Sequence, residues 1–109
     1  MSDSSLCVAC RAALALCPES DLASIAQRLR VSKRTLQTTL RRAGLPFQML
    51  RNEVRLERAE ALLVDDPRPV RAIATAIGFT SVGHFIHWFR RYRGATPGLW
   101  RARMLRGAR

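Results

Sequence analysis

The stretch that decides the fold is residues 70–100, which reads VRAIATAIGFTSVGHFIHWFRRYRGATPGLW. Apolar residues recur at helical spacing before Gly78, which predicts a short helix that ends on a residue with positive φ. Ser81 is a good N-cap for a second helix. Phe85 and Phe89 recur four residues apart on the face that would anchor this second helix in a core. The stretch therefore has the form of a helix-turn-helix.

An earlier stretch, residues 21–43, has the same layout. Asp21 is a good N-cap for the segment LASIAQRLR, and Ser32 can cap a further helix over residues 33–43. Gly44 then stops that helix. The chain therefore contains a second copy of the unit found in residues 70–92.

Three more helices complete the expected all-α fold of about seven helices. One covers residues 6–17 after the mostly polar residues 1–5, which we expect to be frayed; a long one covers residues 47–64, and a short one follows Pro97. The long helix is expected to line the core with Phe47, Leu50, Val54, Ala61 and Leu62. The expected divisions are residues 1–20 (extension and supporting helix), 21–44 (first helix-turn-helix), 45–66 (linker helix) and 67–109 (second helix-turn-helix and last helix).

The charge of the chain points to an anionic partner. The 109 residues carry 19 Lys and Arg against 8 Asp and Glu, for a formal net charge of +11. Only Lys33 is a lysine, and guanidinium groups suit phosphate and guanine recognition because they bind in a planar fork. No apolar run approaches the roughly 20 residues that a membrane span needs. Nucleic acid, an anionic surface or an acidic protein remain as partners.

Three pieces of the sequence carry a family resemblance: LASIAQRLRVSKRTLQTTL, VRLERAEALL and IATAIGFTSVGHFIHWFRRYRGATP. Through them, the chain resembles the DNA-binding domain of AraC/XylS-type transcription regulators over about residues 21–103. The resemblance implies seven helices in two helix-turn-helix units joined by a long central helix. It also implies that two recognition helices enter successive major-groove segments of double-stranded DNA, which recur about 34 Å apart.

The first recognition helix presents a polar stripe opposite Leu36 and Leu40. Arg can bind guanine O6 and N7, and Gln can bind adenine N6 and N7, so this stripe is suited to base recognition. A solvated helix face is the alternative interpretation. The resemblance implies base contacts by Arg34, Gln37 and Thr38, and the helical spacing adds Arg41.

The second recognition helix departs from the family pattern. Its outward residues Val82, Gly83, Ile86 and His87 offer few bidentate hydrogen-bonding groups. Val82 and Ile86 can touch thymine methyl groups, and His87 can bond a base or a phosphate. Alternatively, the helix contacts mainly the DNA backbone and recognises the shape of the DNA. The residues leave both interpretations open. Other departures are Arg30 in place of a usual Gly in the first turn, Pro46 in place of Ser, and Trp100 in place of Tyr.

Phosphate contacts are expected from basic side chains and from helix N-termini. Each arginine alone is equally well explained as a surface charge, and Arg55 can instead pair with an acidic residue in the core. The main candidates are Ser32, Lys33, Arg51, Arg71, Ser81 and Arg90, with Arg91, Arg93, Arg101 and Arg103 as further ones.

Other kinds of site are less well supported. Cys7, Cys10 and Cys17 lack a fourth zinc ligand nearby and fit better as small buried residues, and His84 and His87 lack a third ligand. Tyr92, Trp88 and Trp100 are expected in the core rather than on a stacking surface. We find no nucleophile–base pair and no cofactor motif, so neither catalysis, a cofactor nor a metal is expected.

The sequence therefore predicts a sequence-specific DNA-binding module of a bacterial-type transcription regulator. The resemblance implies an activator that acts in the cytoplasm on the nucleoid, with RNA polymerase as a possible partner. Only about 20 residues precede the first helix-turn-helix, so we expect a piece of a longer chain, monomeric alone, without an effector site of its own. The rivals are a nonspecific architectural or RNA-coating protein that uses only its charge, and a metal protein or enzyme built on the cysteines.

Overall fold

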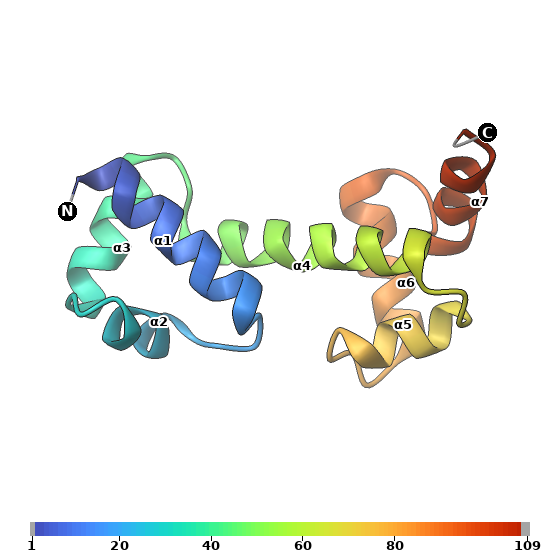
Figure 1. Cartoon of the computed structure of the whole chain (residues 1–109), viewed down its shortest axis with the longest axis horizontal. Coiled ribbons are helices and arrows are strands. Elements are labelled where there is room, and N and C mark those ends of the chain that lie inside the picture. The colour runs from blue at the N-terminus through green and yellow to red at the C-terminus, as the bar shows by residue number, and fades with distance from the viewer. Residues whose placement is uncertain (1, 108–109) are drawn as a thin grey trace. The chain divides into compact units, whose positions relative to one another are not determined.

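The computed structural model describes residues 2–107 (Figure 1). These residues form helices and no strand, so the prediction of an all-α fold is confirmed. None of the helices among them is long and apolar enough to cross a membrane. The helices are α1 (Asp3–Leu16), α2 (Leu22–Arg28), α3 (Lys33–Arg42), α4 (Phe47–Asp65), α5 (Val70–Ala76), α6 (Val82–Arg93) and α7 (Pro97–Gly107).

The chain divides into two compact units, Met1–Arg55 (unit 1) and Leu56–Arg109 (unit 2). Each unit has its own hydrophobic core. The core of unit 1 contains Leu6, Cys10, Ala13, Leu14, Ile25, Ala26, Leu36, Leu40, Leu50 and Val54. The core of unit 2 contains Leu56, Ala59, Leu63, Ile73, Ala74, Ile77, Phe85 and Phe89.

Helix α4 supplies side chains to both cores, and this corrects one prediction. Leu50 and Val54 lie in the first core, whereas Leu56, Ala59 and Leu63 lie in the second. The expected single stripe through Ala61 and Leu62 is wrong for Ala61, which is exposed, while Leu62 is half-buried. The apolar face changes between Val54 and Leu56 because the helix serves two cores. The pattern expected of an amphipathic helix assumes one core.

In unit 1, a tight turn joins α2 to the recognition helix α3. The side chains of Asp21 and Ser32 cap the two helices by accepting from the backbone N–H of Ser24 (2.8 Å) and Thr35 (3.0 Å), as predicted. Between the helices, Arg30 has a left-handed backbone with φ of 60°. The backbone N–H of Val31 reaches back to the carbonyl of Ala26 (3.1 Å), a bond that closes a Schellman turn.

Unit 2 repeats this turn with a glycine. Gly78 has φ of 99°, and the N–H of Phe79 donates to the carbonyl of Ala74 at 3.0 Å. Ser81 caps α6 by accepting from the N–H of His84 at 3.3 Å. The two turns therefore use the same hydrogen-bond pattern, and the predicted repeat of the helix-turn-helix is confirmed.

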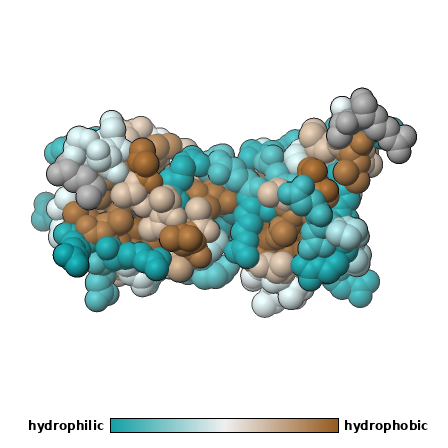
Figure 2. Space-filling model, viewed as in Figure 1, coloured by the Kyte–Doolittle hydropathy of each residue, from teal (hydrophilic) through white to brown (hydrophobic). Residues whose placement is uncertain are grey.

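Helix α1 begins earlier than expected, so the prediction of a frayed start is wrong for the described residues before Leu6. The Ser2 hydroxyl accepts from the backbone N–H of Ser5 (3.2 Å), which caps the first turn. The outer face of α1 is apolar: Val8 and Leu16 are 69% and 77% exposed. Figure 2 shows this as a hydrophobic band over α1. The exposed basic side chains of unit 1 lie outside α1, in α2, α3 and the turn between them.

We expect Arg30→Gly to stabilise the protein by about 0.5–1 kcal/mol. A non-glycine residue in the left-handed region costs about 1–2 kcal/mol, and the greater freedom of glycine in the unfolded chain offsets part of the gain. Urea denaturation followed by circular dichroism measures the change. Gly44, whose φ is +74°, provides the control: a Cβ there meets nothing within 4 Å, so Gly44→Ala should destabilise through backbone strain alone. A loss of stability in Arg30→Gly would contradict the interpretation that the left-handed backbone of Arg30 is strained.

Candidate nucleic-acid interface

The outer side of α3 is a polar and basic surface. Leu36 and Leu40 are fully buried on its inner side. The side chains expected to contact DNA are all exposed on the outer side, so the helix presents them together. They are Arg34, Gln37, Thr38 and Arg41, which we call the α3 face, with Ser32 and Lys33 at the N-terminal end.

The outer side of α6 is different in character. Phe85 and Phe89 are fully buried on its inner side, and Phe79 and Trp88 pack beside them with ring centroids 5.1 Å apart. On the outer side, Val82, Gly83 and His87 are exposed and Ile86 is half-buried. We call Val82, Gly83, Ile86 and His87 the α6 face; it is mostly apolar, and Arg90 lies exposed one turn beyond it.

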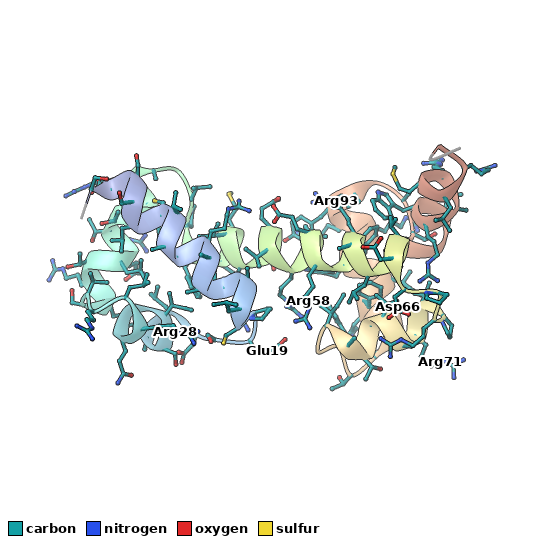
Figure 3. The ribbon with its side chains drawn as sticks, viewed as in Figure 1. Glu19, Arg28, Arg58, Asp66, Arg71 and Arg93 are labelled. Carbon is teal, nitrogen blue, oxygen red and sulfur yellow. The ribbon has the colours of Figure 1, made fainter. Side chains whose placement is uncertain are left out.

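Several arginines named as phosphate candidates bind the protein itself. Arg93 of α6 forms a salt bridge with Glu60 of α4 (Figure 3). Arg51 donates to the carbonyls of Pro18 (3.2 Å) and Glu19 (3.4 Å), which holds the loop between α1 and α2 against α4. Sequence reasoning missed these partners because they are about 30 residues away along the chain. A phosphate contact by Arg51 or Arg93 would have to use the remaining N–H groups.

Arg101 binds the end of helix α4. Its Nε donates to the carbonyl of Leu63 at 2.7 Å and its Nη2 to that of Asp66 at 2.8 Å. The last carbonyls of a helix have no partner within the helix, so the guanidinium satisfies one of them at Leu63, together with the carbonyl of Asp66 just past the end of α4. The Asp66 carboxylate in turn accepts from Arg68, and these hydrogen bonds lower the pKa of Asp66. Asp66 thus binds Arg101 through its backbone carbonyl and Arg68 through its carboxylate, and both contacts hold the loop that leads into α5.

Other basic side chains stay available to a partner. Arg71 is exposed on α5 and extends away from it (Figure 3). Arg55 is not one of them: it is half-buried, and burial is the main cause that lowers its pKa, while Glu19 acts in the opposite direction. The exposed arginines outside the two recognition faces therefore include Arg71, Arg90, Arg91 and Arg103.

The cysteines and aromatic residues add no second site. Cys10 is buried, whereas Cys7 and Cys17 are half-buried, and the Cys17 sulfur accepts from Arg28 at 3.2 Å. Residues 2–107 hold no group of three or more side chains suited to a metal ion. Trp88 and Trp100 pack on the core of unit 2, as predicted. The prediction was wrong for Tyr92, which is 42% exposed and packs its ring edge-on against Trp88 at the margin of that cluster.

Known proteins resemble this chain in sequence and fold. A family model described as a helix-turn-helix domain matches residues 25–103. The HTH-type transcriptional regulator GadX of Escherichia coli O6:H1 is 38% identical over 79 residues, which are 72% of this chain and 29% of GadX. The chain therefore spans less than a third of that relative's length.

Two crystal structures share the fold over nearly the whole chain. A DNA-binding transcriptional dual regulator from Escherichia coli K-12 superposes with a TM-score of 0.85 and 29% identity, covering 93% of each chain. An AraC-type DNA-binding domain-containing regulator from Chromobacterium violaceum gives 0.84 and 26% identity over 91% of each chain. GadX and the proteins in these two structures are all named as transcription regulators.

We expect Arg101→Ala to destabilise the protein by about 2 kcal/mol, because it leaves the carbonyls of Leu63 and Asp66 without their charged donor. Thermal denaturation measures this loss. Arg103→Ala, on the same helix but exposed, is the matched control and should change stability by less than about 0.5 kcal/mol. Equal stability of the two variants would argue against the role of Arg101 at the end of α4.

Burial, together with the neighbouring Cys7, raises the pKa of Cys10 to about 11. At pH 8 only about 0.1% of this thiol is ionised, and the thiolate is the reactive form. Alkylation of the native protein with iodoacetamide, followed by mass spectrometry, should therefore modify Cys7 and Cys17 but leave Cys10 unmodified until denaturant is added. Modification of Cys10 at the rate of Cys7 in the native protein would contradict its burial.

Proposed function

This chain belongs to the AraC-type family of helix-turn-helix transcription regulators, and we propose that it binds double-stranded DNA sequence-specifically through α3 and α6. The observation that carries the proposal is the α3 face, where four hydrogen-bonding side chains are exposed together on a helix whose other side is fully buried. A helix with one rigidly anchored face is what major-groove recognition requires.

Direct base recognition is assigned mainly to α3. Arg34 binds the O6 and N7 atoms of a guanine, and Gln37 binds the N6 and N7 atoms of an adenine. Thr38 and Arg41 lie one turn further along and contact neighbouring base edges or phosphates. We propose that each recognition helix enters its own major-groove segment, since such segments recur about 34 Å apart on one side of DNA.

Phosphate contacts supply affinity without sequence information. Lys33, Arg71 and Arg90 are exposed basic residues that can neutralise phosphates, and Ser32 and Ser81 begin helices whose N-terminal N–H groups favour anions. Each neutralised phosphate releases counterions. The affinity should therefore fall steeply as the salt concentration rises.

A nonspecific nucleic-acid-binding protein is the alternative, and the family relationship does not favour it. Competition distinguishes the two functions. Under the proposal, a duplex obtained by random-site selection stays bound at about 150 mM salt in the presence of excess random DNA. A protein that uses only its charge would release the selected duplex under these conditions.

The role in the whole regulator is also part of the proposal. GadX and related proteins are about three times as long as the matched region. The Escherichia coli proteins FapR and AggR, which are 32% and 33% identical over 76 residues, are named transcriptional activators. We infer that this chain serves an activator in the cytoplasm, with RNA polymerase as a partner, and that it is monomeric on its own. The proposal assigns no catalytic step to the chain.

We expect Arg34→Ala and Gln37→Ala each to weaken binding to the selected duplex by about 1–3 kcal/mol and to relax specificity at one base pair. The loss arises because a bidentate contact to one base disappears. Fluorescence anisotropy on the selected duplex and on single-base variants measures both effects.

Arg106→Ala is the charge-matched control, because Arg106 is exposed on α7 and hydrogen-bonds its own helix. This variant should lose little affinity, equally for selected and random DNA. Base recognition by α3 is wrong if Arg34→Ala and Gln37→Ala also lose affinity equally on both kinds of DNA.

A further inference from the structure

Gly83 has no explanation inside the protein. It is the second residue of α6, and it is not among the glycines with positive φ, which are Gly44, Gly78 and Gly94. A Cβ built on it would meet only the Ser81 hydroxyl at 3.5 Å, an ordinary contact distance. Alanine would therefore fit and would favour the helix. The missing side chain matters for something outside the chain that comes close to this turn.

The surroundings of Gly83 are apolar and held in place. Val82 and Ile86 lie one turn apart on the same side of α6, and Gly83 lies beside them, about one turn before Ile86; Val82 is 37% exposed and Ile86 is half-buried. Both are β-branched, so their side chains have few rotamers in a helix. Phe85 and Phe89, fully buried on the opposite side, fix the rotation of the helix. Val82 and Ile86 therefore present an apolar surface beside the position where Gly83 has no side chain, and we call these three residues the notch.

We propose that this notch holds the 5-methyl group of a thymine, so that α6 recognises thymine by shape and not by hydrogen bonds. The inference rests on the proposed function, because it assumes that α6 enters the major groove. It explains Gly83 through the close approach of the base and the apolar neighbours through the methyl group. His87 and Arg90 lie at the edge of the notch, where they contact the backbone of the same strand.

Other bases fit this notch less well. In the major groove thymine is the base that presents a methyl group, whereas guanine and adenine present N7 acceptors and cytosine presents an amino group. Beside an apolar surface these polar groups lose water and gain no partner; thymine O4 has the same disadvantage, but burial of the adjacent 5-methyl group offsets it. The notch therefore selects thymine partly by attraction of the methyl group and partly by exclusion of the alternatives.

Deoxyuridine provides the test, since it lacks only the 5-methyl group of thymine. The probe is the duplex selected from random sequences by the wild-type chain, with each thymine replaced in turn by deoxyuridine. We expect at least one replacement to weaken wild-type binding about three- to tenfold, in line with the burial of one methyl group.

Gly83→Ala adds a methyl group to the protein side of the same contact. On the thymine duplex we expect it to weaken binding about fivefold or more, because two methyl groups compete for one space. On the matching deoxyuridine duplex the alanine should fill the vacant space, so that the variant prefers deoxyuridine while the wild type prefers thymine. Its Tm should rise by a few degrees, since alanine favours the helix.

Gly98→Ala is the matched control, because Gly98 is the second residue of α7 and has nothing within 4 Å of a built Cβ. It should raise Tm similarly without changing the preference between thymine and deoxyuridine. Thymine recognition by the notch is contradicted if deoxyuridine leaves the affinity unchanged at every thymine position. It is also contradicted if Gly83→Ala leaves the preference between thymine and deoxyuridine unchanged. If no duplex can be selected at all, both the proposed function and thymine recognition by the notch are contradicted. If a duplex is selected but deoxyuridine changes its affinity nowhere, only thymine recognition by the notch is contradicted.

Discussion

The left-handed residue between the two helices of each unit fixes what the rest of the unit can present. Arg30 and Gly78 occupy this position, and the following N–H in each case returns to a carbonyl of the preceding helix. These bonds involve only backbone atoms, so Arg30 and Gly78 can both form the turn, although the left-handed conformation is strained for Arg30. Once the turn is set, burial of one face of α3 or α6 leaves the opposite face exposed. The recognition face is thus a consequence of the turn and the core together.

The distribution of arginines follows from the cost of removing charge from water. A guanidinium that is partly buried needs several oriented acceptors to offset its desolvation. Arg101 finds two carbonyls at the end of α4, and Arg93 finds the carboxylate of Glu60. Arginines without such acceptors in reach lie at the surface, where their charge is hydrated. The surplus of +11 is therefore not uniformly available, because part of the positive charge is used in contacts inside unit 2.

Local features were predictable from the sequence, whereas features that join distant segments were not. The caps Asp21, Ser32 and Ser81 were predicted correctly because a cap depends on residues only three positions apart. The burial of α4 was predicted incorrectly at Ala61, because nothing local shows that one helix serves two cores. The salt bridge of Arg93 with Glu60 spans 33 residues, and no pattern in the sequence connects them. The positions of the exposed side chains on α3 follow from its periodicity, but what they contact is not encoded in it.

The two recognition faces would achieve specificity in different physical ways. Hydrogen bonds from Arg34 and Gln37 are directional, so a wrong base leaves a desolvated donor or acceptor on the protein. An apolar notch has no polar group of its own to leave unpaired, and it discriminates through the unpaired groups of the wrong base and through shape. Such a notch contributes little affinity, because one methyl group buries a small area. The phosphate contacts of a strongly basic chain can supply the missing affinity. A chain with this much positive charge can therefore accept an apolar second recognition helix, provided that α3 carries most of the hydrogen-bonded recognition.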